Sequence, residues 1–165
     1  MVVNHRAGFA ALALAAAVAA LGGWAFGEWL RLNPCHLCIF QRLLACLLLV
    51  IAVFGLLLPM ARRLWAALAA LTAAGGLTTA LYQSWLQLNP DPANECGFGE
   101  RTAIEQLVDW FGMRWPDFFL ATGFCSSKEW VFLGLSIANW ACFFFAGVLA
   151  LALWLFYKKH QEGTA

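Results

Sequence analysis

Residues 33–58 of the chain read NPCHLCIFQRLLACLLLVIAVFGLLL. A polar stretch that contains Pro34 leads into a C-x-x-C pair, Cys35 and Cys38, and a long apolar run follows the pair. Because crossing a bilayer takes about 20 apolar residues, this run predicts a transmembrane helix. The sequence therefore places a dithiol at the edge of a membrane, where a helix begins.

Three further apolar runs complete the expected architecture. The chain has 165 residues, of which 63% are hydrophobic and 12% are charged. We predict an all-α membrane protein, a four-transmembrane-helix bundle with helices over about residues 8–30, 39–58, 64–86 and 133–157. The loops are too short to bury a core of their own, so residues 1–165 are expected to form a single membrane domain.

The first apolar run has some features of a signal peptide. It follows His5 and Arg6, and Ala19-Ala20 has the small side chains of a cleavage site. Its apolar stretch is longer than the roughly 7–15 residues of a signal-peptide core, however. This length favours a retained helix.

A long outer loop, about residues 87–131, contains the second pair of cysteines, Cys96 and Cys125. Within it, Thr102-x-x-Glu105 is typical of a capping box at the start of a helix. The apolar side chains that follow fall on one helical face: Ile104, Leu107, Val108 and Phe111. We expect a short amphipathic helix here, either lying on the membrane surface or packed on the end of the bundle.

The charged residues indicate the orientation of the chain in the membrane. One side carries five cations on short segments (Arg6, Arg62, Arg63, Lys158 and Lys159) with one acid, Glu162. The other side carries four cations on longer segments together with eight acids. Cytoplasmic loops are enriched in Lys and Arg, so both termini and the turn at Pro59–Arg63 are predicted to be cytoplasmic. The paired cysteines then face outward; in a bacterium this side of the inner membrane is the periplasm, where disulfides persist. The net charge of +1 indicates no nucleic-acid partner.

The chemistry of the Cys35–Cys38 pair follows from its place in the first turn of a helix. Unpaired backbone N–H groups and the helix dipole favour a thiolate there, and His36 between the cysteines could add positive charge. Thiol–disulfide exchange requires a thiolate that reaches a disulfide sulfur. Two cysteine pairs on one side of a membrane therefore indicate a redox relay.

A metal site is the main alternative for a C-x-x-C pair. Such a site usually needs a second Cys or His pair at similar spacing, which Cys96 and Cys125 do not provide. A c-type haem needs a histidine after the second cysteine, and residue 39 is isoleucine. Redox chemistry is favoured, and no metal is predicted.

Arg42 is the other residue that the sequence singles out. It follows Cys38 by one helical turn, so both side chains lie on the same helical face. Charges inside a membrane are costly and usually functional, and this cation is suited to stabilise negative charge on Cys38 and on a reduced carbonyl acceptor. The alternative is an arginine that extends to the lipid head groups. Cys46 and Cys142 lie deep in apolar sequence and are expected to be inert.

Three stretches of the chain resemble the DsbB family of bacterial quinone-dependent disulfide generators. They are residues 33–42, NPCHLCIFQR; residues 86–92, LQLNPDP, followed by Cys96; and residues 119–125, FLATGFC, followed by WVFLGL at 130–135. The resemblance covers almost the whole chain in order and spacing. One departure is Gln41, because relatives often carry an acidic residue before the motif arginine. This change leaves the arginine without an adjacent counter-ion and could alter quinone preference.

The resemblance implies a mechanism for a quinone-dependent protein dithiol oxidoreductase. Cys96–Cys125 would be the disulfide attacked by a reduced DsbA-like periplasmic thioredoxin-fold oxidase, with Cys96 forming the mixed disulfide. Cys125 would then attack Cys35, which leaves the Cys38 thiolate facing a membrane quinone, ubiquinone or menaquinone, with Arg42 beside it.

Two other classes of membrane protein fit the sequence less well. A structural or adaptor protein with a disulfide-bridged outer loop, similar in outline to tetraspanins, would have no use for a C-x-x-C pair at the membrane edge, and the tetraspanin Cys-Cys-Gly motif is absent. A small transporter or channel subunit would need a polar pathway, and Arg42 is the one ionisable residue well inside a predicted helix.

Overall fold

The computed structural model describes residues 5–90 and 101–157 of the chain. Four helical segments in it are long and apolar enough to cross a membrane, which confirms the all-α, four-helix class. The first comprises α1 (His5–Ala17), a π-helical turn (Val18–Gly22) and α2 (Gly23–Leu30). The others are α3 (His36–Leu57), α4 (Arg62–Leu88) and α7 (Ile137–Tyr157). The remaining elements are a 3₁₀ turn (Pro59–Ala61), α5 (Ala103–Arg114), α6 (Pro116–Phe119), β1 (Val131–Phe132) and β2 (Leu135–Ser136).

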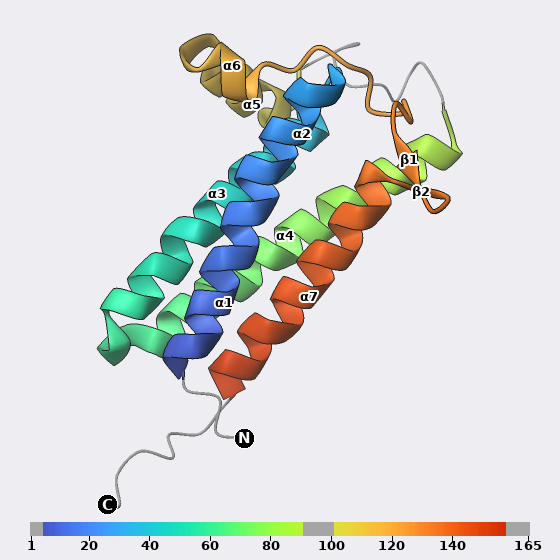
Figure 1. Ribbon diagram of the computed structural model, residues 1–165. Coiled ribbons are helices and arrows are strands. Elements are labelled where there is room, and N and C mark those ends of the chain that lie inside the picture. The colour runs from blue at the N-terminus through green and yellow to red at the C-terminus, as the bar shows by residue number, and fades with distance from the viewer. Residues whose placement is uncertain (1–4, 91–100, 158–165) are drawn as a thin grey trace, which may run out of the picture.

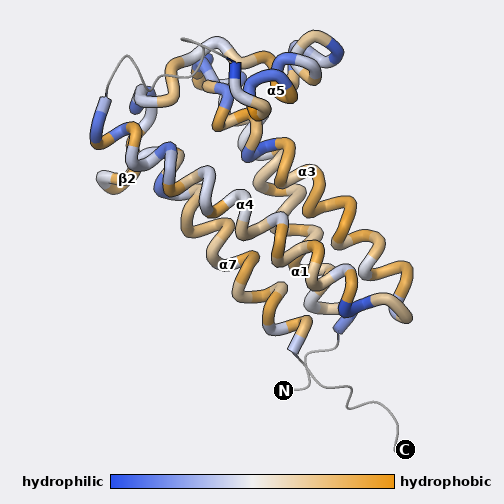
Figure 2. The backbone as a smooth tube through the Cα atoms, turned by 180° about the vertical axis from the view of Figure 1, so that it is seen from behind, coloured by the Kyte–Doolittle hydropathy of each residue, from blue (hydrophilic) through white to orange (hydrophobic). Residues whose placement is uncertain are grey.

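The four spanning segments form an elongated bundle (Figure 1). Helix α4 packs most extensively on α7, while α3 packs on both α1 and α4; α1 and α7 touch little. The start of α1, the α3–α4 turn and the end of α7 lie together at one end of the bundle (Figure 1). Helices α5 and α6 and the small hairpin lie at the other end. The spanning helices are predominantly apolar, and hydrophilic residues are more frequent at the end that carries α5 (Figure 2).

Small residues allow the helices to approach closely, because membrane helices associate through van der Waals packing rather than through hydrophobic exclusion from lipid. A Cβ at Gly76 on α4 would overlap the Phe145 ring of α7, and one at Gly55 on α3 would overlap Phe9 of α1. Gly23, in contrast, has no atom near the position of an added Cβ, and it lines a cavity.

The fourth spanning helix begins at Ile137 rather than at about residue 133. Residues 131–136 form the antiparallel β1–β2 hairpin, with Leu133 (φ 53°) and Gly134 (φ 79°) at its turn. Two positive φ angles are typical of a two-residue hairpin turn. The helix then starts with reciprocal bonds, in which Ser136 N–H donates to Asn139 Oδ1 (3.0 Å) and Asn139 N–H donates to Ser136 Oγ (3.4 Å).

Helix α5 has the predicted capping box. The Thr102 hydroxyl accepts the Glu105 N–H, and the Glu105 carboxylate accepts the Thr102 N–H. The helix packs on the outer end of α3 and buries Val108, while Leu107 and Trp110 stay largely exposed. One face of α5 therefore packs on the bundle, and another face leaves apolar side chains exposed.

Candidate redox site

The Cys35–Cys38 pair occupies the N-terminus of α3. Cys35 is the N-cap residue in extended conformation, and its Sγ accepts the Cys38 backbone N–H at 3.3 Å. The two thiols are free, and their sulfurs lie 2.9 Å apart. Hydrogen bonding to Cys38 and burial raise the pKa of the Cys35 thiol well above its usual value. Cys35 is therefore harder to ionise than an ordinary thiol.

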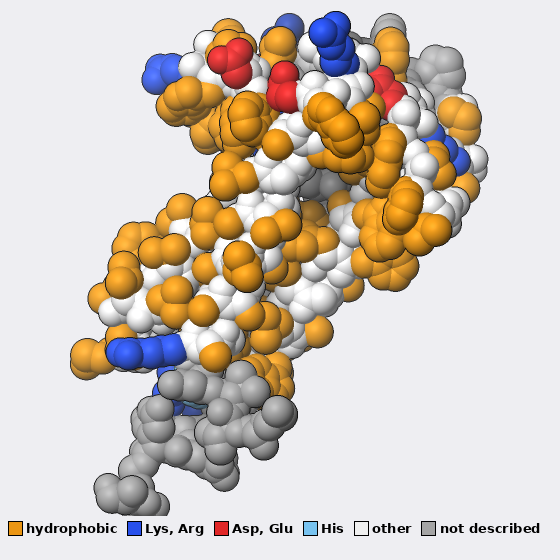
Figure 3. All heavy atoms as spheres, viewed as in Figure 1, with side chains coloured by type: hydrophobic (Ala, Val, Ile, Leu, Met, Phe, Trp, Pro, Cys, Tyr) orange, Lys and Arg blue, Asp and Glu red, His pale blue; other side chains and the backbone are white. Residues whose placement is uncertain are grey.

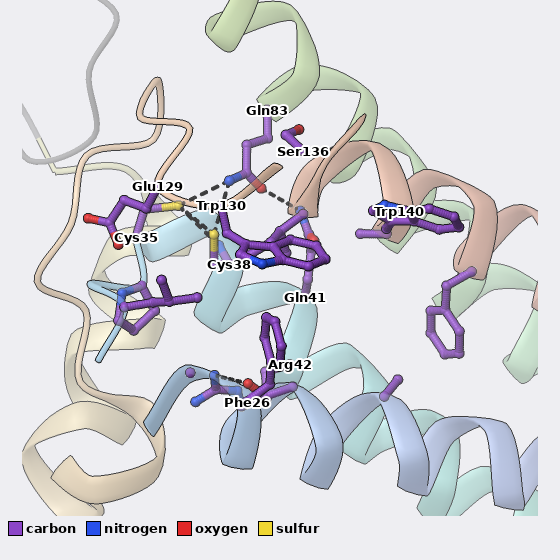
Figure 4. A pocket seen from close by; sticks show the side chains of 18 of the residues that line it. Phe26, Cys35, Cys38, Gln41, Arg42, Gln83, Glu129, Trp130, Ser136 and Trp140 are labelled. Atoms are coloured by element: carbon purple, nitrogen blue, oxygen red, sulfur yellow. Dashed lines mark hydrogen bonds between the residues drawn. The ribbon is translucent and has the colours of Figure 1, made fainter. Parts of the chain in front are cut away.

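A buried glutamine on α4, which the sequence analysis did not single out, contacts both sulfurs. Gln83 Nε2 donates to Cys38 Sγ at 3.0 Å and to Cys35 Sγ at 3.3 Å (Figure 4). Gln41 Nε2 donates in turn to Gln83 Oε1 at 2.9 Å. The signal that could have found them is the presence of two amide side chains within apolar helices, where a polar group needs a partner.

The His36 side chain contacts α5. Its Nε2 lies 3.2 Å from Asp109 Oδ1, so the imidazole joins the start of α3 to α5. Arg101 lies 3.6 Å from the other oxygen of the same carboxylate. This contact holds α5 against the start of α3.

The loop after α6 brings Cys125 close to the dithiol. Cys125 is disulfide-bonded, and it shares a small buried cluster with Cys35, Leu37 and Leu86. Cys96, its partner in the sequence-based interpretation, lies outside the described residues. The C-x-x-C motif joins Cys35 and Cys38 in the sequence, and the fold brings Cys125 next to them.

Two sets of hydrogen bonds hold this loop against the residues before α3. Thr122 N–H and Gly123 N–H donate to the Pro34 carbonyl oxygen at 2.9 and 3.1 Å. Asn33 donates to the Glu129 carboxylate from its backbone N–H (2.6 Å) and from Nδ2 (3.2 Å). A Cβ at Gly123 would overlap the Asn33 carbonyl oxygen, so the close approach depends on glycine at this position.

Arg42 lies deeper along α3 than the cysteines. Its Nη1 donates to the Phe118 carbonyl oxygen at 2.6 Å, and its Nη2 donates to the Gly23 carbonyl oxygen at 3.4 Å. The guanidinium carbon is 5.7 Å from the centre of the Phe118 ring. Arg42 thus links α3 to α2 and α6, and its hydrogen bonds in the described chain go to carbonyl groups rather than to Cys38.

A cavity of about 840 Å³ connects these groups. Its walls are largely apolar and come from the π-helical turn, α2 and α7, the helices that touch each other little; the visible face is hollowed in this region (Figure 3). Its polar end, next to the dithiol (Figure 4), contains Cys38, Gln41, Arg42 and Gln83, and the charged residues Lys128 and Glu129 also line the cavity. Ligand sites of this size commonly have apolar walls and a few placed polar groups.

Comparisons with known proteins agree with this arrangement. A family model described as "Disulfide bond formation protein DsbB" matches residues 5–155. The chain belongs to the DsbB family. A relative named "Disulfide bond formation protein B" from Dechloromonas aromatica (strain RCB) is 50% identical over 159 residues, 96% of each chain. Relatives of the same name from Azoarcus sp. (strain BH72) and Shewanella sp. (strain MR-4) are 40% and 36% identical, over 82% of this chain and 84% and 77% of theirs.

Membership in the DsbB family makes this chain a disulfide-generating, multi-pass membrane protein with a disulfide-forming oxidoreductase role. The adaptor alternative is not favoured, because the relatives are named for disulfide formation.

Proposed function

We propose that this DsbB-family protein reoxidises a DsbA-type thiol oxidase in the periplasm and delivers the electrons to a membrane quinone, ubiquinone or menaquinone. The observation that carries the proposal is the position of the Cys35–Cys38 dithiol. On one side it lies beside the disulfide-bonded Cys125, and on the other it borders the apolar cavity. A dithiol in this position has access both to a protein disulfide and to a ligand that partitions into lipid.

The residues around the cavity fit a quinone. A quinone has a planar ring with two carbonyl oxygens and an apolar tail, and it accepts two electrons and two protons when it is reduced. Gly22 and Gly23 leave room for a flat group, and the aromatic side chains of α7 supply apolar wall. Arg42 at the polar end provides positive charge that favours an oxygen carrying developing negative charge. Cys38 borders the same end and supplies the electron-rich sulfur.

The proposed relay moves one disulfide through the chain. A partner thiolate attacks Cys96, which breaks the Cys96–Cys125 bond and leaves the electron pair on Cys125. Cys125 then attacks Cys35 of the oxidised pair, which breaks the Cys35–Cys38 bond and leaves the electron pair on Cys38. Cys35 is suited to receive this attack, since it lies in the same buried cluster as Cys125. The second thiol of the partner then displaces Cys96, and the partner leaves as a disulfide. Cys96 displaces Cys35 from Cys125, which restores the Cys96–Cys125 disulfide. The reduced Cys35–Cys38 pair would then give two electrons and two protons to the quinone and return to the disulfide.

The energetics support a quinone as acceptor. DsbA is a strong oxidant at about −120 mV, and about 30 mV is equivalent to about 1.4 kcal/mol for a two-electron couple. A protein disulfide by itself has little driving force to oxidise such a partner. Transfer of the electrons to a more oxidising acceptor supplies the missing free energy.

We propose that the end of the bundle formed by the start of α1, the α3–α4 turn and the end of α7 lies in the cytoplasm. Arg62 and Arg63 lie at this end, next to the start of α1 and the end of α7 (Figure 1). Basic residues are enriched on the cytoplasmic side of membrane proteins. We infer an inner-membrane location, a single membrane domain over residues 1–165, and periplasmic cysteine pairs.

Purified protein should oxidise a reduced DsbA-type partner only when a quinone is added. The assay follows partner thiols and quinone absorbance together without oxygen, and the proposal requires one quinone reduced for each partner disulfide formed. A reaction without enzyme is the control. Equal partner oxidation with and without quinone would contradict the proposal.

The loop contact at Gly123 gives a further prediction. Gly123→Ala should separate Cys125 from Cys35, because the added methyl group overlaps the Asn33 carbonyl oxygen. Overpacking costs about 1–3 kcal/mol, so we expect turnover to fall about ten-fold. Steady-state oxidation of the partner measures this. Gly75→Ala is the matched control, since nothing lies near an added Cβ there; an equal loss in both variants would contradict the assigned role of the contact.

A further inference from the structure

Two buried amide side chains, Gln41 on α3 and Gln83 on α4, lie beside the dithiol (Figure 4). Both are less than one-tenth exposed, at 7% and 3%. They form a chain of hydrogen bonds that runs from Gln41 to Gln83 and ends on the two sulfurs. Neither glutamine belongs to the cysteine relay, so this chain of bonds needs its own explanation.

The orientation of the Gln83 amide follows from the group that it faces. Gln41 Nε2 donates to Gln83 Oε1, so the oxygen end of the Gln83 amide faces Gln41. This contact turns the two N–H groups of Gln83 towards the sulfurs. Buried polar groups are costly to leave unpaired, so the low exposure of both side chains holds the arrangement in place.

We propose that Gln83 stabilises the thiolate formed on Cys38 when the Cys35–Cys38 disulfide opens, and that Gln41 is a positioning residue that fixes the direction of the Gln83 amide. In this step the bond from Cys125 to Cys35 forms, the bond from Cys35 to Cys38 breaks, and the electron pair remains on Cys38 Sγ. Gln83 Nε2 donates its hydrogen bond to this sulfur. The identity of the attacking group rests on the proposed function, but the stabilisation of the thiolate does not.

The partners of the neighbouring groups support this assignment. The guanidinium of Arg42 is bound to the carbonyl oxygens of Phe118 and Gly23, and His36 is bound to Asp109. Among the described residues, Gln83 is the side chain that donates an N–H to Cys38 Sγ. Hydrogen bonds to charged groups are stronger than those between neutral groups, so this bond favours the opened, charged pair over the closed disulfide.

A donor that favours the reduced pair makes the disulfide more oxidising, as stabilisation of the reduced form does in strongly oxidising thiol proteins. The measurable quantity is the equilibrium of the Cys35–Cys38 pair with dithiothreitol in full-length, detergent-purified protein. Alkylation of the equilibrated protein and mass spectrometry of the peptide that contains both cysteines give the reduced fraction. This measurement needs neither quinone nor a partner protein, so it stands if the proposed function fails.

Gln83→Met keeps the length and volume of the side chain but removes both donors. We expect it to shift the equilibrium constant about ten-fold towards the disulfide, which corresponds to about 30 mV. Gln41→Met should shift it in the same direction by less. The double variant should match Gln83→Met alone, because Gln41 acts through Gln83, and independent structural effects would instead add.

Gln87→Met is the matched control, one turn further along α4. Gln87 is also buried, but its hydrogen bonds go to Ser127 and Ser136 rather than to sulfur. This variant should leave the redox equilibrium unchanged. An unchanged equilibrium in Gln83→Met, or additive shifts in the double variant, would overturn the proposal; Gln41→Met tests it independently if Gln83→Met does not fold.

Discussion

Cys38→Ser is expected to reduce quinone-dependent turnover to the uncatalysed background. A hydroxyl cannot form the disulfide with Cys35, and it does not become the anionic, polarisable nucleophile that a thiol supplies. Cys35 and Cys38 both line the cavity, but a single remaining thiol of the pair cannot form the disulfide that carries the two electrons. The rate of quinone reduction with excess reduced partner measures the loss.

The two remaining free cysteines provide matched controls for this loss. Cys46 lies two turns further along α3, and Cys142 lies on α7, where its sulfur is 3.7 Å from Ser84 Oγ. Cys46→Ala and Cys142→Ala should leave turnover nearly intact, while Cys96→Ser should abolish capture of the partner in a mixed disulfide. Full turnover by Cys38→Ser would show that the relay runs through other atoms.

The features that the sequence predicted have strong local signals. Long apolar runs predicted the four spanning helices, because no other regular structure satisfies its backbone within a single apolar segment. The α5 start was predicted from Thr102 and Glu105, whose side chains act on backbone groups three residues away. The position of Cys35 and Cys38 at a helix start likewise follows from Pro34 and the apolar residues that come after it.

The features that the sequence did not predict depend on contacts between distant segments. The hairpin residues Val131, Phe132 and Leu133 are as apolar as the α7 residues that follow. Their composition therefore does not distinguish the hairpin from the start of the helix, and only the strand pairing in the structure does. The contact of Gln83 with Cys38 depends on how α4 is rotated against α3. In the same way, Gly23 lines a cavity rather than a helix contact, because the first and last spanning segments pack little on each other.

Arg42 combines a predicted position with unpredicted contacts. The sequence placed it one turn below Cys38, and the structure adds that it donates to carbonyl oxygens of α2 and α6 at the polar end of the cavity. Two roles are compatible with these contacts. The arginine either provides charge for a ligand oxygen in the cavity, or it holds the loop while its charge is shared with head groups.

Arg42→Gln separates the two roles. If Arg42 provides charge to the quinone site, the apparent Michaelis constant for quinone should rise about 10- to 150-fold, because a charge-assisted hydrogen bond contributes roughly 1.5–3 kcal/mol. Exchange between the two cysteine pairs should be retained. Arg42→Lys should lie between, since an ammonium keeps the charge but loses the planar fork that reaches two oxygens.

The loop-holding role gives a different pattern in the same titration. It predicts lower expression, normal quinone kinetics and equivalence of lysine with arginine at position 42. Arg114→Gln is the matched control. The guanidinium carbon of Arg114 lies 4.9 Å from the centre of the Trp110 ring on α5, and Arg114 is not among the residues that line the cavity. An unchanged Michaelis constant in Arg42→Gln, at a fixed concentration of reduced partner, would remove Arg42 from the quinone site.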